Sequence, residues 1–128
     1  MKHIGGNTTA VIQQRTTAKN EYGESVQTWD DVQSISGFLD MLSGNADYTY
    51  NAKIVESTNV FVCDYYTLLV NAENGRMIIN DGVYEITYID DPMGLHYQLE
   101  IFLKYIGGLQ NLQNTDQPNL QRVMMYAS

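Results

Sequence analysis

The chain has 128 residues, enough for one domain, and its 44% hydrophobic and 17% charged residues are typical of a folded globular protein. Fifteen acidic residues outweigh seven basic ones, and the scattered Lys and Arg residues argue against binding to a nucleic-acid backbone. The single cysteine, Cys63, excludes an internal disulfide, and no stretch approaches the roughly 20 apolar residues of a membrane span.

The N-terminal third predicts two strands joined by a polar loop. Residues 8–15, TTAVIQQR, are rich in β-branched side chains and predict the first strand. Residues 25–42 alternate apolar and polar side chains over part of their length and predict the second. The loop between them contains Gly23, which we expect at positive φ in a turn.

The second predicted strand contains an irregularity. Ile35 and Leu39 share one parity, but the apolar parity slips between Trp29 and Ile35. An extra residue in one strand of a pair, or a glycine kink, produces such a slip. We therefore expect a bulge near Asp30–Asp31 or a bend at Gly37.

Residues 43–58, SGNADYTYNAKIVEST, interrupt the strand pattern. Ala46, Tyr50 and Ile54 recur every four residues, which fits one or two helical turns with Asn45 as a possible N-cap. An irregular loop rich in Tyr and Asn is the alternative. The sequence leaves both open.

The central part of the chain predicts three more strands, at 58–66, 76–80 and 83–89. The pair Asp81-Gly82 separates the last two, and Asp-Gly between β-rich runs indicates a type I′ hairpin turn. Residues 90–94, DDPMG, indicate a second turn.

The last predicted strand, residues 95–105, has the clearest period of two in the chain. Six apolar or aromatic residues share the face that we expect to be buried, and burying them would contribute on the order of 10 kcal/mol of gross transfer free energy. They are Leu95, Tyr97, Leu99, Ile101, Leu103 and Tyr105.

About six strands with short turns and little helix predict an all-β fold, a small antiparallel barrel or sandwich. One short helix or long loop is expected between strands two and three. We place this domain at residues 1–106. Residues 107–128 form a Gln- and Asn-rich extension that ends in an apolar cluster, and we expect contacts in an assembly to order it.

The sequence shows no arrangement typical of catalysis or metal binding. His3 and His96 are the only histidines, and no metal-ligand spacing, nucleophile motif or phosphate-binding loop is present. Asp90–Asp91 precedes Pro92, where Asp is expected to cap the backbone of a turn. Cys63 lies within a predicted strand, and we expect it to be a buried core residue. We expect no enzyme activity, no cofactor and no metal.

The order of these segments resembles the head–tail joining proteins of tailed bacteriophages, the head-closure or stopper group. The resemblance spans roughly residues 10–105 and rests on motifs that are individually weak but occur in the family's order. They are Tyr22-Gly23, Trp29, Ser43-Gly44, the run Gly82-Val83-Tyr84-Glu85-Ile86 and the run Tyr97-Gln98-Leu99-Glu100-Ile101. The third strand reads Val62-Cys63-Asp64-Tyr65, where the family often has an Arg.

The resemblance implies a structural protein of the virion neck, made in the host cytoplasm. Such proteins form a ring, usually of twelve copies, beneath the portal and its adaptor, where the ring retains packaged DNA and docks the tail. DNA would pass through the channel without specific binding, and no membrane contact is implied.

The resemblance also implies site residues. The segment between strands two and three would form the channel gate: Ser43, Gly44, Asn45, Ala46, Asp47, Tyr48, Thr49, Tyr50, Asn51, Ala52 and Lys53. Trp29 is expected as a core or subunit-interface anchor, with Tyr22 packed beside it. The C-terminal apolar cluster would complete the assembly contacts: Val123, Met124, Met125 and Tyr126.

Two alternative functions stay open at this point. A tail terminator or tail-completion protein of similar barrel fold would stack on the tail tube instead of the adaptor. A carbohydrate-binding barrel would need Trp29 and several of the ten Tyr residues exposed on one flat face.

Overall fold

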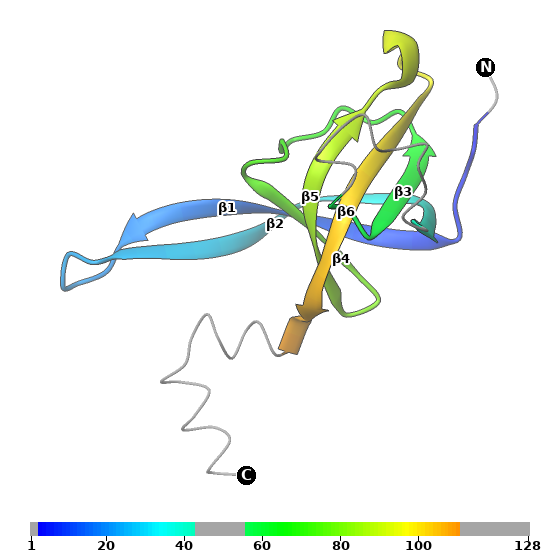
Figure 1. The fold of residues 1–128 in the computed structure, drawn as a ribbon. Helices are drawn as coiled ribbons and strands as arrows, with labels where there is room; N and C mark the ends of the chain where they lie inside the picture. The colour runs from blue at the N-terminus through cyan, green and yellow to red at the C-terminus, as the bar shows by residue number, and fades with distance from the viewer. Residues whose placement is uncertain (1–2, 43–55, 111–128) are drawn as a thin grey trace.

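The computed structural model describes residues 3–42 and 56–110, which form one closed antiparallel barrel (Figure 1). Around the barrel the strands are ordered β1-β2-β3-β6-β5-β4, which confirms the predicted all-β fold of six strands. The predicted helix or loop between strands two and three lies outside the described residues. The elements are β1 (Thr8–Lys19), β2 (Ser25–Met41), β3 (Asn59–Asp64), β4 (Gly75–Ile79), β5 (Gly82–Asp90), the 3-10 turn η2 (Pro92–Gly94) and β6 (Gln98–Gly108).

The barrel interior is filled by apolar side chains from all six strands. Alternate residues of each strand point inward, and each large side chain removed from water contributes roughly 1.5–3 kcal/mol. Cys63 lies in this core, as predicted, and burial together with the neighbouring Asp64 charge raises the pKa of its thiol to about 12. The largest fully buried side chains are Phe61, Ile12, Ile35, Met77, Ile79, Ile101, Leu103, Val83 and Cys63.

The parity predicted for the last strand is confirmed at its centre and wrong at both ends. Leu99, Ile101 and Leu103 are buried, whereas Leu95, Tyr97 and Tyr105 are about half exposed. The first two precede β6 and lie in the loop after η2, and Tyr105 lies near the rim of the barrel. An alternating pattern shows which residues share a face, but it does not show where the neighbouring strands end.

The β4–β5 hairpin has the predicted kind of turn, placed one residue earlier. Asn80 and Asp81 are its central residues, with φ of 49° and 64°, and Ile79 pairs with Gly82. Both central positions need positive φ, which Asn and Asp tolerate better than most residues. Gly82 is needed for space: a Cβ there would lie 3.1 Å from the Tyr105 ring.

The predicted irregularity of the second strand is also confirmed. Ile12 pairs with Gln33 and Gln13 with Asp31, so Val32 is an extra residue next to the expected Asp30–Asp31 position. Such a bulge increases the local twist of the pair, and here it lies where the two strands leave the barrel.

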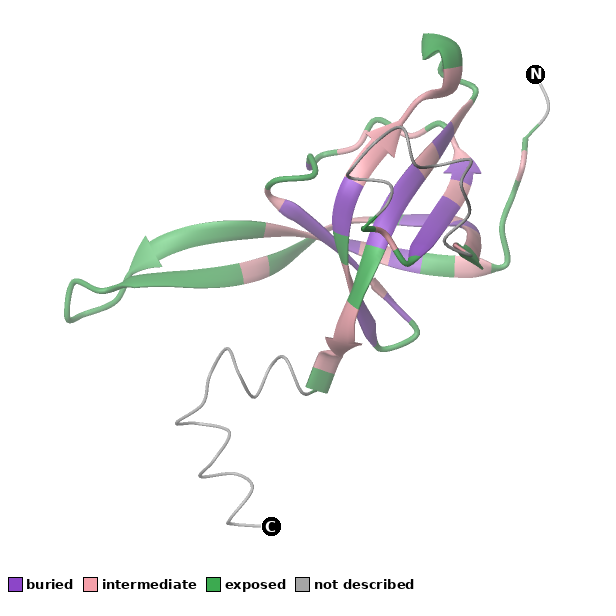
Figure 2. Cartoon of the chain, viewed as in Figure 1, coloured by how far each residue is buried: buried purple, intermediate pink, exposed green. Residues whose placement is uncertain are grey.

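The outer halves of β1 and β2 form a two-stranded arm that projects from the barrel (Figure 1). Pairing of β1 with β4 ends at Gln14, and pairing of β2 with β3 begins only at Gly37. The arm comprises Arg15–Lys19 and Ser25–Trp29 with the connecting loop, and all its residues except Trp29 are exposed (Figure 2). The first strand therefore extends four residues beyond its predicted end.

The arm loop is held by one side chain. The Asn20 carboxamide oxygen accepts hydrogen bonds from the backbone N–H groups of Tyr22 and Glu24, each 2.9 Å long. Gly23 adopts the predicted positive φ, 81°. This local capping is typical of Asn in turns, and it fixes the loop without any contact to the barrel.

Gly37 provides a test of how tightly the sheet closes. A Cβ at Gly37 would lie 2.5 Å from the Val62 carbonyl oxygen and 2.6 Å from the Phe61 ring, so Gly37→Ala forces backbone and core atoms apart. We expect it to lower the free energy of unfolding by about 1–3 kcal/mol, measured by urea denaturation. At Gly108 a Cβ meets nothing closer than 3.9 Å, so Gly108→Ala is the matched control. Equal stability of the two variants would contradict the close approach at Gly37.

Candidate functional site

The root of the arm is built around Trp29 and Arg76. Trp29, on β2, lies face to face with the Arg76 guanidinium from β4, whose central carbon is 4.2 Å from the ring centroid. Arg76 is 7% exposed, and its Nε donates a 2.7 Å hydrogen bond to Gln13 Oε1. Gln13 Nε2 in turn donates to Asp31 Oδ1 at 2.8 Å. A cation held over an indole contributes about 0.5–2 kcal/mol, so this stack fixes the angle at which the arm leaves the barrel.

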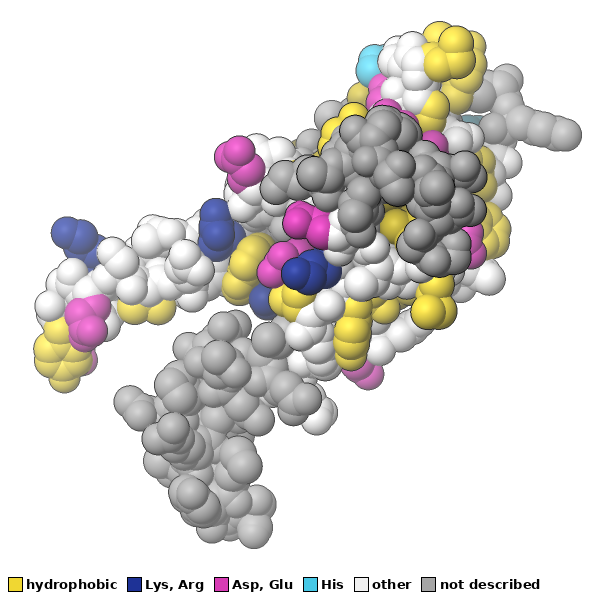
Figure 3. All heavy atoms as spheres, in the orientation of Figure 1, with side chains coloured by type: hydrophobic (Ala, Val, Ile, Leu, Met, Phe, Trp, Pro, Cys, Tyr) yellow, Lys and Arg dark blue, Asp and Glu magenta, His cyan; other side chains and the backbone are white. Residues whose placement is uncertain are grey.

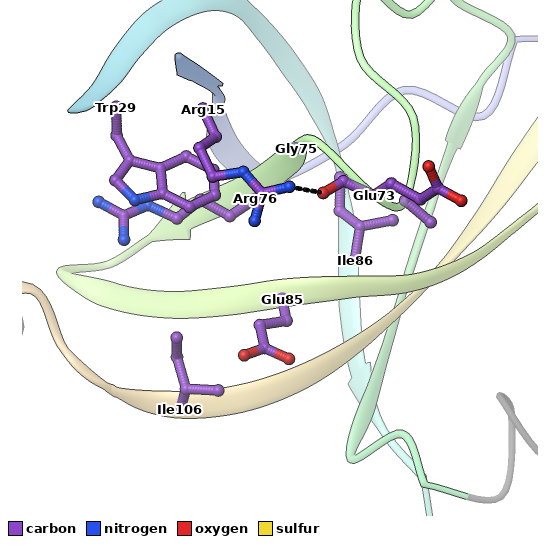
Figure 4. A pocket seen from close by; sticks show the side chains of 9 residues that line it. Arg15, Trp29, Glu73, Gly75, Arg76, Glu85, Ile86 and Ile106 are labelled. Carbon is purple, nitrogen blue, oxygen red and sulfur yellow. Dashed lines mark hydrogen bonds between the residues drawn. The ribbon is translucent and has the colours of Figure 1, made fainter. Parts of the chain in front are cut away.

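A cavity of about 260 Å³ lies beside this stack (Figure 4). Arg15 and Glu73 lie on one side, where Arg15 Nη2 donates a 2.9 Å hydrogen bond to the Glu73 carbonyl oxygen. Glu85 lies across from Arg15, and the lining as a whole carries two cations, Arg15 and Arg76, and two acidic residues, Glu73 and Glu85 (Figure 4). The lining contains no Ser, Cys or His, so the cavity has a charge-balanced wall and no nucleophile with a base.

The structure places the two predicted anchors apart. Trp29 is half-buried at the root, and its role as a core or subunit-interface anchor stays a prediction. Tyr22 lies in the loop at the far end of the arm and is 80% exposed. The prediction that Tyr22 packs beside Trp29 is therefore wrong, because the arm extends as a ribbon instead of folding back.

A wider groove of about 630 Å³ lies at the barrel end where β2 stops and β3 begins. Tyr84 and Tyr105 line it with ring centroids 5.3 Å apart, and burial and the neighbouring Tyr105 raise the pKa of Tyr84. Met41, 85% exposed, lies at its edge. The Leu42 N–H donates to the Thr58 carbonyl at 2.8 Å, so the chain leaves and re-enters the barrel at this groove.

The opposite barrel end carries the loop from β5 to β6. Met93 and His96 adopt positive φ of 59° and 58°, which is uncommon for residues other than glycine. The Asp91 carboxylate holds this conformation by accepting hydrogen bonds from the His96 N–H, at 3.0 Å, and from its ring Nδ1. Asp91 makes no side-chain capping bond to η2 itself, so its carboxylate holds the following loop instead of the predicted turn. His96 lies in this exposed loop beside Tyr65, before β6 begins.

The N-terminal segment is tied to the same end. The Asp64 carboxylate accepts hydrogen bonds from the backbone N–H groups of Ile4, at 2.6 Å, and Gly5, at 3.0 Å. These two bonds and the nearby His3 lower the pKa of Asp64. Donors that favour the charged form of a carboxylate have this effect, so the N-terminus remains attached while Asp64 is ionised.

A pair of carboxylates faces outward between β5 and β6. Asp90 and Glu100 are directly opposite each other in the register, and neither has a hydrogen bond or ion pair with another residue in the described ranges. Burial and the Asp90 charge raise the pKa of Glu100. Like charges at such positions oppose folding, so this pair costs the isolated subunit some stability.

Nothing among residues 3–42 and 56–110 assembles a metal site or a membrane-spanning helix. No three His, Cys, Asp or Glu side chains of these residues are grouped to hold a metal ion. No helix formed by them is long and apolar enough to cross a membrane. The remaining predicted site residues, 43–53 and 123–126, lie outside the described part of the chain.

Sequence reasoning missed the contacts that join distant positions. Arg76 and Trp29 are far apart in the chain, as are Asp64 and Ile4, and neither pair belongs to a motif. No local signal in the sequence pointed to either contact.

Comparison with known proteins identifies the family. The model of the phage head completion protein family matches residues 1–105. The chain belongs to this family. The head-completion family gives the chain a structural role in the phage head, at the head–tail region of the virion and in contact with other head or tail proteins. Such a role indicates a protein that is not an enzyme.

A solved structure supports the fold. The solution structure of protein SF1141 from Shigella flexneri 2a matches with a TM-score of 0.63 and 20% sequence identity, and the match covers 82% of this chain and 96% of that one. At this identity the likeness shows the fold alone. A search of curated proteins found no match.

The carboxylate pair of this head completion protein predicts a pH-dependent stability. Since the folded-state pKa of Glu100 is raised, its charged form costs stability above that pKa, and the cost disappears as the pH falls below the unfolded-state value, about 4.3. Glu100→Gln should therefore raise the free energy of unfolding of the dilute subunit at pH 7 by a few tenths to about 1 kcal/mol. The gain should vanish near pH 4 in urea titrations.

The matched control for this prediction is Glu85→Gln. Glu85 lies on β5, opposite Lys104 of β6 in the register. Because its neighbour carries the opposite charge, removing the charge of Glu85 should give no gain in the free energy of unfolding at pH 7. Equal gains in both variants would mean that net charge, and not the Asp90–Glu100 pair, sets the stability.

Proposed function

We propose that this head completion protein assembles as a ring, of twelve copies as the family resemblance implies, beneath the portal and its adaptor. The ring would close the DNA channel, retain the packaged genome and offer a docking surface to the tail. The observation that carries this proposal is the projecting β1–β2 arm on a barrel of the head-completion family.

The arm is difficult to explain in a protein that acts alone. A two-stranded hairpin is marginally stable at best in water, and here no residue from Arg15 to Thr28 is buried. Contact with a neighbour would remove this surface from water. In a ring, one side of each subunit meets the opposite side of the next, and a projecting element suits such a heterologous contact.

The charge of the chain suits a channel through which DNA passes. Among the described residues, thirteen are Asp or Glu and four are Lys or Arg; Asp47 and Asp116 and the basic Lys2, Lys53 and Arg122 lie outside them. Copies of an acidic subunit around an axis create a field that repels DNA and disfavours its adhesion. Solubility alone would also favour this charge, so it supports the ring without requiring it.

For the gate we propose residues 43–53, with Tyr48 and Tyr50 as bulky plugs. Support comes from the described residues on either side: the Leu42 N–H donates a hydrogen bond to the Thr58 carbonyl oxygen at one barrel end. A segment held at its base can reach away from the barrel without disturbing the core. The C-terminal residues 123–126 are proposed to contact a neighbouring virion protein.

Deletion of Tyr48–Asn51 tests the gate. Phage with this deletion should produce heads that fill with DNA and then lose it, because the ring forms but its channel stays open. DNA retention is measured as nuclease-resistant genome per purified head. A variant with Tyr48→Phe and Tyr50→Phe, which keeps the bulk of both proposed plugs, is the matched control and should retain DNA. Unchanged retention in the first variant would place the gate elsewhere.

Imaging of virions tests the ring and its position. Cryo-electron microscopy should show this barrel as a ring on the neck axis, in contact with the adaptor. A ring that contacts only the tail tube would favour the tail-terminator alternative, and absence from particles would overturn both. The carbohydrate-binding alternative receives no support from the aromatic positions, since Trp29 stacks on Arg76 and Tyr22 lies far from it.

A further inference from the structure

One face of the arm carries basic side chains in an otherwise acidic protein. The register pairs Arg15 with Trp29, Thr17 with Gln27 and Lys19 with Ser25, so these side chains share a face. Figure 3 shows dark blue Lys and Arg side chains along the arm and at its root.

Lys19 is the basic residue of this face that can reach a neighbour. Arg15 is held at the root, where it donates to the Glu73 carbonyl oxygen. Lys19 lies next to the arm loop, is exposed, and has no hydrogen bond or ion pair with another described residue. From Arg15 to Lys19 the strand advances roughly 13 Å, at about 3.3 Å per residue, which carries the ammonium group well beyond the barrel wall.

The complementary charge lies on the other side of the barrel. In the strand order β1-β2-β3-β6-β5-β4, β6 is diametrically opposite β1, and β5 is diametrically opposite β2. The arm therefore belongs to one side of the subunit and the Asp90–Glu100 pair to the other. Both carboxylates face outward, because their neighbours Ile89, Leu99 and Ile101 pack in the core.

We propose that the Asp90–Glu100 pair of one copy receives Lys19 from the arm of the next copy. This inference rests on the proposed ring, since it names the two surfaces that meet at each subunit boundary. A cation placed between the carboxylates would offset their mutual repulsion, and an arm on one side with its receptor on the other allows the contact to repeat around a closed ring. The partner is a second copy of this chain because one subunit carries both halves of the contact.

Cysteine cross-linking in particles tests the contact directly. In phage that carry Lys19→Cys together with Glu100→Cys, a bismaleimide whose spacer spans the length of a Lys–Glu ion pair should give a ladder of covalent multimers on a denaturing gel, because such a pair holds its Cα atoms too far apart for a direct disulfide. Cys63 should not interfere, because it is buried and its raised thiol pKa disfavours the reactive thiolate. Phage that carry only one of the two substitutions are the controls and should give no ladder. The two positions belong to β1 and β6, which lie across the barrel from each other, so the ladder reports links between chains.

The outcomes separate this inference from the proposed function. A ring in the neck without cross-links would overturn the inference and leave the proposed function standing. A cross-link from Lys19→Cys to a different virion protein would also overturn it, and would assign the arm to the adaptor or tail. Absence of the protein from the neck would overturn both.

Charge exchange provides a second, independent test. Lys19→Glu and Glu100→Lys should each reduce the yield of infectious particles by about tenfold or more, since a lost charge pair at an interface costs upwards of about 1.5 kcal/mol. The double variant should recover most of that yield. The controls are Glu56→Lys and Asp40→Lys, which reverse exposed charges before β3 and on β2, away from the proposed contact. Equal losses in the controls, or no recovery in the double variant, would contradict the contact.

Discussion

The short pairing between β1 and β4 is the constraint on which the rest of the structure depends. It joins Val11–Gln14 to Gly75–Ile78 and closes the barrel. Each strand of the barrel therefore has a neighbouring strand on both sides. β1 is longer than this pairing, and its remaining residues have only β2 as a partner. Barrel and arm are thus consequences of one event: closure uses the first half of β1 and leaves the second half projecting into solvent.

The sequence correctly predicted features that depend on the local residue pattern, such as which residues share a strand face. It missed features that depend on where the neighbouring strands end. Alternation correctly assigned Leu99, Ile101 and Leu103 to the core, because period two is a property of the strand itself. It failed for Leu95, which precedes β6, and for Tyr105, which pairs with Tyr84 of β5 but lies beyond the end of the pairing with β3. The arm was missed for the same reason. Polar β-branched residues predict a strand, but they do not show that β4 and β3 no longer pair with its outer half. The Trp29–Arg76 stack was missed because it joins separate strands without a motif.

Stability and assembly place opposite demands on the Asp90–Glu100 pair. In the isolated subunit, burial and then the Asp90 charge raise the pKa of Glu100, so an amide at this position would fold more favourably. If a neighbour's Lys19 lies between them, the same charges become favourable only in the assembly. A substitution that stabilises the subunit and weakens the ring would show this opposition, which a purely structural pair would not produce.

An interface built from an arm and a charge pair also suits a protein that must stay apart until it reaches its site. A wide apolar interface would drive association wherever subunits meet, because apolar burial has no direction. Charges on an extended arm instead steer the partner into one orientation and contribute little at long range in physiological salt. In the proposed ring, the arm contacts of separate subunits would stay weak at low concentration and would become effective together once several copies are held side by side.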